Sequence, residues 1–228
     1  MDRRRFKKFR LMLFILACMF IRCNRDTELV IPVPQYEPPQ DLRKIIPLKI
    51  GNRWEYTRNG CAEANCETSM VSTEIIDTVS IDSVSHFLYQ PTGTVPGPYY
   101  LSAYTERVDS NQYTRYLCGC GKSKPQNALS TTNVWSPSVL LKLPIKVGQK
   151  WQVPGLPLHV DTVTIGNVDT TIVTDAGKFE HAIWVHSINS IYDNLYYEYF
   201  IVPGVGIVYS IDDGFFTYYV TYLTKKNF

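Results

Sequence analysis

Six cysteines are the residues of this 228-residue chain whose type and spacing bear most directly on chemistry. Four of them form two close pairs, Cys61 with Cys66 and Cys118 with Cys120. Zinc binding by these four sulfurs is one interpretation, but the C-x4-C and C-x-C spacings match the usual zinc sites poorly. In an oxidising compartment such thiols are expected to form disulfide bonds instead. We therefore expect two disulfide bonds and no metal site.

The pairing of these cysteines stays open at the level of sequence, because four cysteines allow three connectivities. A bridge between Cys118 and Cys120 would be strained, since a single residue separates them. We therefore favour cross-pairing between the loop at 59–67 and the loop at 118–122. The alternative joins Cys61 to Cys66 and accepts a strained bond between Cys118 and Cys120.

The sequence shows no constellation of catalytic side chains. His181 and His186 are five positions apart on a predicted strand, so they point to opposite faces and cannot bind one ion together. His86 and His159 are isolated in strand-like runs. No Gly-x-Ser-x-Gly or His-Glu-x-x-His motif occurs. We therefore expect a protein that has no catalytic residues, metal or cofactor and is not an enzyme.

The other two cysteines, Cys18 and Cys23, lie in a segment typical of export signals. Six basic residues between positions 3 and 10 precede an uncharged apolar run over 11–21, which is short for a membrane span. Ile15-Leu16-Ala17-Cys18 resembles the lipobox of bacterial lipoproteins, in which the cysteine is lipidated and becomes the mature N-terminus. We favour Cys18 as the lipidated residue and keep Cys23, which polar residues follow, as the alternative. A secreted protein without lipid and an uncleaved anchor are the further alternatives.

Charge argues against a nucleic-acid partner once the basic signal is set aside. The first 26 residues hold eight of the 23 Lys and Arg and two of the 21 Asp and Glu, which leaves 15 basic and 19 acidic residues. Nucleic-acid binding would require a basic patch or stripe, and the remaining sequence shows none. The expected partner is instead a membrane, reached through an N-terminal lipid anchor.

A proline-rich segment follows the signal, which we place at residues 1–23. Residues 27–44 contain four prolines and no glycine, so we predict an extended tether over 24–44 that forms no helix. About 18 residues in polyproline geometry could hold a domain up to roughly 50 Å from its anchor. The alternative is an edge strand at 29–33 packed on the folded domain.

Residues 45–228 have the texture of one all-β domain. Apolar and polar residues alternate with period two between turn signals, which predicts an antiparallel sandwich, barrel or half-barrel with very little helix. The final strand is apolar on both faces and is therefore expected to lie centrally in a sheet or to be covered on both sides. At most one helical turn is expected, at 139–143, and Gly166-Asn167 is expected to be a turn. The predicted strands lie near 52–58, 68–79, 81–90, 99–108, 112–118, 158–165, 168–174, 179–191, 195–202, 205–210 and 215–224.

One eight-residue phrase occurs twice, as PLKIGNRW at 47–54 and PIKVGQKW at 144–151. We interpret it as a strand start, in which Gly permits a turn with positive φ and the strand begins at Trp54 or Trp151. In the first strand we expect Trp54 and Tyr56 to face inward and the charged residues to face outward. The functional alternative is that both tryptophans stack on a ligand. The repeat also suggests two related halves, 45–140 and 141–228.

The order of several motifs resembles that of a known protein family. The motifs are P-L-K-x-G-N-x-W-x-Y near the start, a second P-I-K-V-G-x-x-W midway, DAGKFE at 175–180 and YFIVPGVGIV at 199–208. In this order they resemble a family of uncharacterised bacterial envelope lipoproteins. This chain departs from the family where Thr174-Asp175 replaces the usual proline before Ala-Gly. The resemblance implies an all-β envelope lipoprotein and brings no activity or site residues.

Two hypotheses about function follow from these features. The first is a non-catalytic lipoprotein of the cell envelope, anchored in the outer membrane, whose β-domain is a structural or interaction module. The second is a carrier that binds a lipid or glycan on a concave, aromatic-lined sheet. The sixteen tyrosines suit the second hypothesis, but they also suit any β core.

Overall fold

The structure, a computed structural model, divides the chain into a unit at Met1–Gln35 and a unit at Tyr36–Phe228. It describes residues 36–62, 65–81, 83–93, 104–117, 137–154, 160–189, 196–214 and 217–228, all within the second unit. The signal segment, with Cys18 and Cys23, lies outside the described residues. In the described part of the chain, no helix is both long and apolar enough to cross a membrane.

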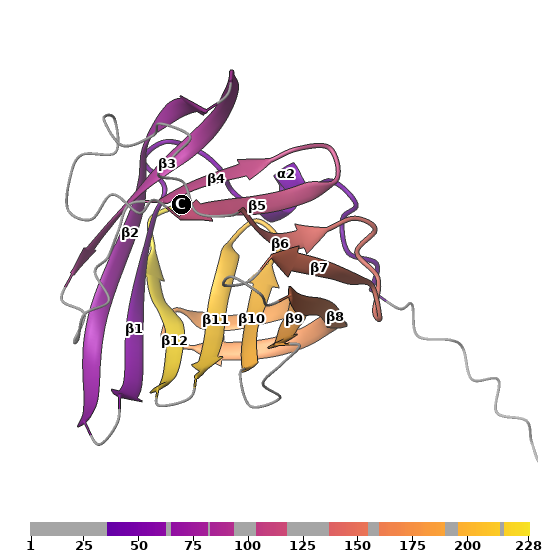
Figure 1. Cartoon of the computed structure of the whole chain (residues 1–228). Coiled ribbons are helices and arrows are strands. Elements are labelled where there is room, and N and C mark those ends of the chain that lie inside the picture. Colours follow the sequence, from indigo (N-terminus) through magenta and orange to yellow (C-terminus); the bar gives the residue numbers. More distant parts are fainter. Residues whose placement is uncertain are drawn as a thin grey trace, which may run out of the picture. The chain divides into compact units, whose positions relative to one another are not determined.

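Antiparallel strands in a single sheet make up the folded unit (Figure 1). The all-β prediction is confirmed, and the residues that the structure describes form one sheet of twelve strands. The predicted central position of the last strand is also confirmed, since β12 pairs with β1 on one side and β11 on the other. The strands are β1 (Arg53–Ala62), β2 (Asn65–Ile81), β3 (Val84–Gly93), β4 (Tyr104–Val108), β5 (Gln112–Leu117), β6 (Ser138–Lys142), β7 (Lys150–Pro154), β8 (Val160–Thr174), β9 (Gly177–Asn189), β10 (Tyr196–Val202), β11 (Gly206–Asp213) and β12 (Thr217–Lys226).

The sheet order runs β6-β5-β4-β3-β2-β1-β12-β11-β10-β9-β8-β7, so β1 to β6 and β7 to β12 are two consecutive meanders. Side chains link the two edges of this sheet. Trp151 Nε1 on β7 donates to the Val139 carbonyl on β6 at 2.9 Å, and the Tyr199 hydroxyl on β10 donates to the Leu140 carbonyl. The sheet therefore curls until it nearly closes into a barrel (Figure 1). Strand β6 replaces the helical turn predicted at 139–143, because its backbone pairs with β5.

A short helix, α2 (Leu42–Ile45), precedes the first strand and is part of the folded unit. Asp41 caps it by accepting a hydrogen bond from the Arg43 amide, and Leu42 and Ile45 are buried. The Ile45 carbonyl also accepts a bond from the Gly204 amide in the β10–β11 turn. The predicted tether is therefore wrong for residues 36–44, because these apolar side chains pack into the core. Its earlier part lies outside the described residues.

Two clusters of buried side chains form the apolar core, mostly on one face of the sheet. We define this inner face as the one that carries Trp54, Trp151 and Tyr199. The first cluster joins α2 to strands β5 to β10, and the second joins β1, β2 and β3 to β9, β10, β11 and β12. The most deeply buried apolar residues of the two clusters are Ile45, Ile75, Leu141, Ile165, Ala182, Ile183, Val185, Ile201, Val208 and Leu223.

Strand β8 runs through Gly166-Asn167, where the sequence predicted a turn. The register with β9 shifts between Ile165 and Asn167. A Cβ atom on Gly166 would lie 2.5 Å from the Trp184 ring on β9. Gly166 is therefore present to make room for an aromatic ring on a bulged strand, and it does not reverse the chain.

The repeated phrase forms the same turn in both places. Asn52 and Gln149 each donate a backbone bond of 3.0 Å to the lysine three residues earlier, Lys49 and Lys146. Gly51 and Gly148 occupy the third position of these turns, with φ of 89° and 83°. This is the positive φ that the third position of a type II turn requires.

Each turn also extends the ladder to the next strand with matching bonds. The amide of Gly51 donates to the Ile75 carbonyl and that of Gly148 to the Ile165 carbonyl, both at 2.8 Å. In return, the Ile75 and Ile165 amides each donate a bond of 3.0 Å to the residue after the glycine. The interpretation of the phrase as a strand start is confirmed by these bonds.

Candidate functional site

Strand β1 brings a charged residue to the inner face. Alternation places Trp54, Tyr56 and Arg58 on one face, and the register between β1 and β2 has no shift that would change it. The Tyr56 hydroxyl donates to the Ile207 carbonyl on β11 at 3.0 Å, which confirms that it faces inward. The prediction that Arg58 faces outward is therefore wrong. Arg58 lies an even number of residues after Trp54 and so shares its face of the strand.

Strands β4 and β5 contribute a buried ion pair to the same face. Glu106 and Arg115 are direct partners across the two strands. The Arg115 Nε and Nη2 atoms lie 2.8 and 2.7 Å from Glu106 Oε1, and the Arg115 and Glu106 side chains are 25% and 2% exposed respectively. Burial alone would lower the pKa of Arg115, but Glu106 and the neighbouring tyrosines together outweigh it and raise that pKa well above its usual value. The Arg115 guanidinium therefore stays charged.

Tyrosines surround this ion pair. The Arg115 guanidinium lies 4.6 Å from the ring centre of Tyr104, which in turn stacks on Tyr89 at 4.7 Å. Burial raises the pKa of Tyr104 to about 12. Burial also raises the pKa of Tyr89 and Tyr113, and both the charge of Glu106 and its hydrogen bonding to them add to the effect. The neutral phenol is therefore strongly favoured throughout the group.

Arg58 has an aromatic support of its own. Its guanidinium carbon lies 3.9 Å from the ring centre of Tyr219 on β12. Tyr219 is paired with Gly60, and a Cβ atom on Gly60 would lie 2.1 Å from the tyrosine ring. Gly60 therefore lets the ring lie close against β1, as glycines in strands often do beneath an aromatic partner.

Asp212 on β11 completes the charged groups of this region. It pairs with Tyr197 on one side and with Tyr219 on the other, which places it on the inner face. Burial raises its pKa, and the charge of Arg58 partly offsets that rise. We refer to the whole set as the tyrosine–arginine cluster, which consists of Arg58, Glu106, Arg115, Asp212, Tyr56, Tyr89, Tyr104, Tyr113, Tyr197 and Tyr219.

The tyrosine–arginine cluster keeps access to solvent although it faces inward. Arg58, Tyr56, Tyr104 and Tyr197 are half-buried, and Asp212 is exposed. The most deeply buried residues of the apolar core have no exposed surface at all. The polar part of the inner face is therefore in contact with solvent, whereas the apolar core is not.

The two repeated tryptophans belong to the apolar core. Trp54 and Trp151 are 4% and 7% exposed. Trp54 Nε1 donates to the Val205 carbonyl at 2.7 Å, just as Trp151 Nε1 donates to Val139. Both indoles are thus fixed and covered, which favours their interpretation as core residues over stacking on a ligand.

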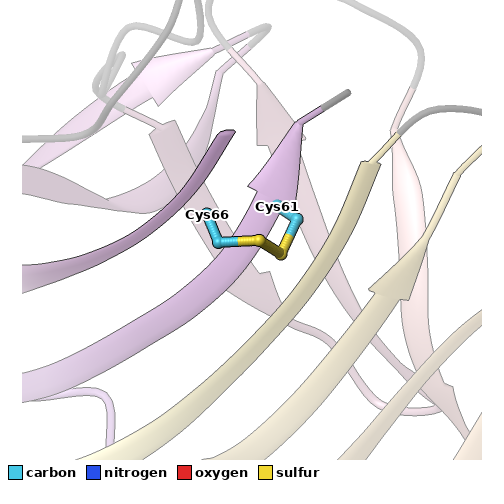
Figure 2. The surroundings of a disulfide bond; sticks show 2 residues. All are labelled: Cys61 and Cys66. Carbon is cyan, nitrogen blue, oxygen red and sulfur yellow. A yellow bond between two sulfur atoms is a disulfide. The ribbon is translucent and has the colours of Figure 1, made fainter. Parts of the chain in front are cut away.

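A disulfide bond joins Cys61 and Cys66 across the β1–β2 hairpin, as Figure 2 shows. The two residues are direct partners in the strand register, with Cα atoms 4.0 Å apart. The favoured cross-pairing is therefore wrong for these cysteines, because the hairpin brings them together locally. Their oxidised sulfurs also cannot serve as zinc ligands. Cys118 and Cys120 lie outside the described residues.

The opposite face of the sheet carries a second polar group. Glu198 on β10 accepts hydrogen bonds at Oε2 from Trp184 Nε1, at 2.8 Å, and from the Tyr196 hydroxyl. His186 lies beside these rings, and burial lowers its pKa. No group of three or more His, Cys, Asp or Glu side chains that could hold a metal ion occurs among the residues the structure describes.

Comparison with known proteins adds little to this description. No protein-family model and no curated protein matches the chain. One similar solved structure, from Bacteroides fragilis, is provisionally described as an exported protein with a YmcC-like fold. It is 13% identical to this chain, and the match covers 81% of this chain and 99% of that protein with a TM-score of 0.49. A second structure, from Parabacteroides distasonis, is provisionally described as a lipoprotein. It is 13% identical to this chain, and the match covers 78% of this chain and 96% of that protein with a TM-score of 0.44. Likeness at this level carries no conclusion about function.

Sequence reasoning missed the tyrosine–arginine cluster, although part of its signal was present. Arg58 follows Trp54 and Tyr56 at intervals of two, and Glu106 follows Tyr104 in the same way. Strict alternation would have placed both charges on the inner face. No sequence pattern, however, indicated that β4 and β5 place Glu106 directly opposite Arg115.

Proposed function

We propose that this chain is a non-catalytic lipoprotein of the bacterial cell envelope, anchored in the outer membrane, whose β-domain binds a small ligand at the tyrosine–arginine cluster. The observation that carries the binding proposal is the solvent access of inward-facing Arg58, Tyr104 and Tyr197 beside a filled apolar core. Ligand sites combine apolar and aromatic walls with a few polar groups that orient the ligand. The cluster has this composition.

A binding role suits the geometry of Glu106 better than a catalytic role. A general acid or base must exchange a proton with substrate. The Glu106 carboxylate is instead covered by protein and held by two nitrogen atoms of Arg115. We therefore assign the pair to orienting the surrounding tyrosines and, through them, the ligand.

The location in the envelope is supported by the N-terminal pattern. The basic segment, the apolar run and the lipobox-like sequence ending at Cys18 are those of an exported protein that receives a lipid. Mass spectrometry of the mature N-terminus tests this part of the proposal. A diacylglyceryl group on Cys18 or Cys23 is expected, whereas an unmodified chain cleaved elsewhere would overturn the anchor.

The binding role is tested with N-phenyl-1-naphthylamine, a small aromatic probe whose fluorescence rises in an apolar site. We expect the full mature chain to bind it with saturation, and we expect Tyr104→Ala to weaken binding by about tenfold because one stacked ring is lost. Val173→Ala, at a side chain that is 73% exposed, is the matched control and should leave binding unchanged. Absence of saturable binding by the folded chain would favour a purely structural β-domain.

A further inference from the structure

We infer that the ligand carries an anionic group and that Arg58 binds this group. The inference rests on the proposed binding role of the tyrosine–arginine cluster and specifies the chemistry of its ligand. It starts from the difference between the two inward-facing arginines. Arg115 is paired with Glu106 at 2.7 Å, whereas Arg58 forms no ion pair with any carboxylate in the described part of the chain.

The immediate surroundings hold Arg58 in place without neutralising it. Tyr219 supports one face of the guanidinium, and the Nε atom is buried without a hydrogen-bond partner among the described residues. An arginine is always charged, and a buried donor without a partner is unfavourable. A ligand anion would supply the counter-charge that the fold does not provide.

The charged and titratable groups around Arg58 come from four other elements, of which β12 supplies Tyr219. The charge of Arg58 acts to lower the pKa of Asp212 on β11, but the two side chains form no ion pair, while Arg115 on β5 is already paired. The charge of Arg58 also acts to lower the pKa of Tyr197 on β10. Burial is the larger effect and raises that pKa, so the phenol stays neutral.

This arrangement fits one class of ligand, an aromatic or aliphatic molecule with a single carboxylate, phosphate or sulfonate group. The rings of Tyr104, Tyr197 and Tyr219 would contact the apolar body. The guanidinium of Arg58 would bind the anion through charge-assisted hydrogen bonds, for which its planar fork of donors is well suited.

Two probes with the same aromatic skeleton test the inference. 8-Anilinonaphthalene-1-sulfonate differs from N-phenyl-1-naphthylamine by one sulfonate group. We expect the full mature chain to bind the sulfonate on the order of tenfold or more tightly than the neutral probe, as charge-assisted hydrogen bonds would provide. Arg58→Gln should abolish this preference, because it should weaken binding of the sulfonate by at least tenfold more than binding of the neutral probe.

Arg53→Gln is the matched control, because Arg53 lies on the same strand with a side chain that is 45% exposed. It should keep the preference for the sulfonate. A preference that survives Arg58→Gln, or an equal loss of affinity for both probes, overturns the inference while the proposed binding role stands. Failure of the wild-type chain to bind either probe overturns both.

A second variant keeps the test decisive if Arg58→Gln does not fold. Arg58→Lys retains the charge but lacks the planar fork and the stacking surface. We expect it to lose several-fold more affinity for the sulfonate than for the neutral probe. Unchanged affinity for the sulfonate would then contradict the role of the Arg58 guanidinium.

Discussion

The apolar core and the tyrosine–arginine cluster lie on the same inner face of one sheet, yet they differ in chemistry and in access to solvent. On β1 the change takes four residues, from Trp54, which is 4% exposed, to Arg58, which is half-buried. The comparison shows that period-two alternation determines which face a side chain occupies, but not whether that face is filled. Whether apolar side chains fill the space over that face depends on residues from strands that are distant in the sequence. The core is therefore expected to control stability and the cluster to control binding.

Truncating a core tryptophan should have the largest effect on stability. Trp151→Ala would leave a cavity and remove the hydrogen bond that links β7 to β6. We expect a loss of roughly 3–5 kcal/mol in the free energy of unfolding, measured by urea denaturation. Val173→Ala, at a side chain that is 73% exposed, should change it by less than about 0.5 kcal/mol. A loss below about 1 kcal/mol for Trp151→Ala would show that the sheet does not depend on this closure.

Breaking the ion pair of the cluster should cost less than truncating the core. Glu106→Gln leaves Arg115 without its counter-charge, which we expect to cost about 3 kcal/mol in the free energy of unfolding. This is the low end for buried pairs, because the Arg115 side chain is 25% exposed. The same substitution in a pair with both side chains exposed, Glu180→Gln, should change stability little.

The double variant Glu106→Gln with Arg115→Met sharpens this test. Removing both charges should recover part of the stability lost in Glu106→Gln, because no unpaired charge remains. Additive losses would instead mean that the two side chains stabilise the fold independently. The cluster would then not behave as one electrostatic unit.

Alkaline pH should destabilise the folded chain in part through the cluster. The pKa of Tyr104 is about 12 in the folded protein and about 10 in the unfolded chain. Above pH 10 the unfolded chain releases this proton first, so stability falls as pH rises from about 10 to about 12. The shift corresponds to about 2–3 kcal/mol.

Tyr104→Phe tests the assignment of this pH dependence. Denaturation followed between about pH 9 and pH 12 should show a smaller decline in stability for the variant than for the wild-type chain. Tyr218→Phe is the control, since Tyr218 is 45% exposed. Equal slopes for wild type and Tyr104→Phe would contradict the raised pKa of Tyr104.

The repeated strand starts should give the smallest and most similar effects. Gly51 and Gly148 both have positive φ, and the space that a Cβ atom would occupy is open at each, so strain arises from the backbone alone. Gly51→Ala and Gly148→Ala should each cost about 1 kcal/mol in the free energy of unfolding. Asn tolerates positive φ better, so Gly51→Asn and Gly148→Asn should cost less. A cost that differs several-fold between Gly51→Ala and Gly148→Ala would show that the two turns are not equivalent.

Local patterns in the sequence predicted most of the strands and the strand starts at Trp54 and Trp151. They failed where distant segments decide the outcome. β6 is a strand because β5 pairs with it, and α2 is a helix because Leu42 and Ile45 find a buried site. Gly166 was mistaken for a turn because its aromatic partner, Trp184, comes from the next strand.

The candidate site was harder to predict than the fold for the same physical reason. Alternation along the strand indicated which face Arg58 occupies. It could not indicate that the Tyr219 ring, from a strand far along the chain, lies against the guanidinium. The favoured cysteine pairing was wrong for the opposite reason, since Cys61 and Cys66, which only the alternative pairing joined, are brought together by their own hairpin.

A crystal structure of the mature chain with N-phenyl-1-naphthylamine bound would test the central claim most directly. The account predicts density for the probe on the inner face, in contact with Tyr104 and Tyr197 and close to Arg58. Density confined to the opposite face, around Trp184 and Glu198, would contradict it.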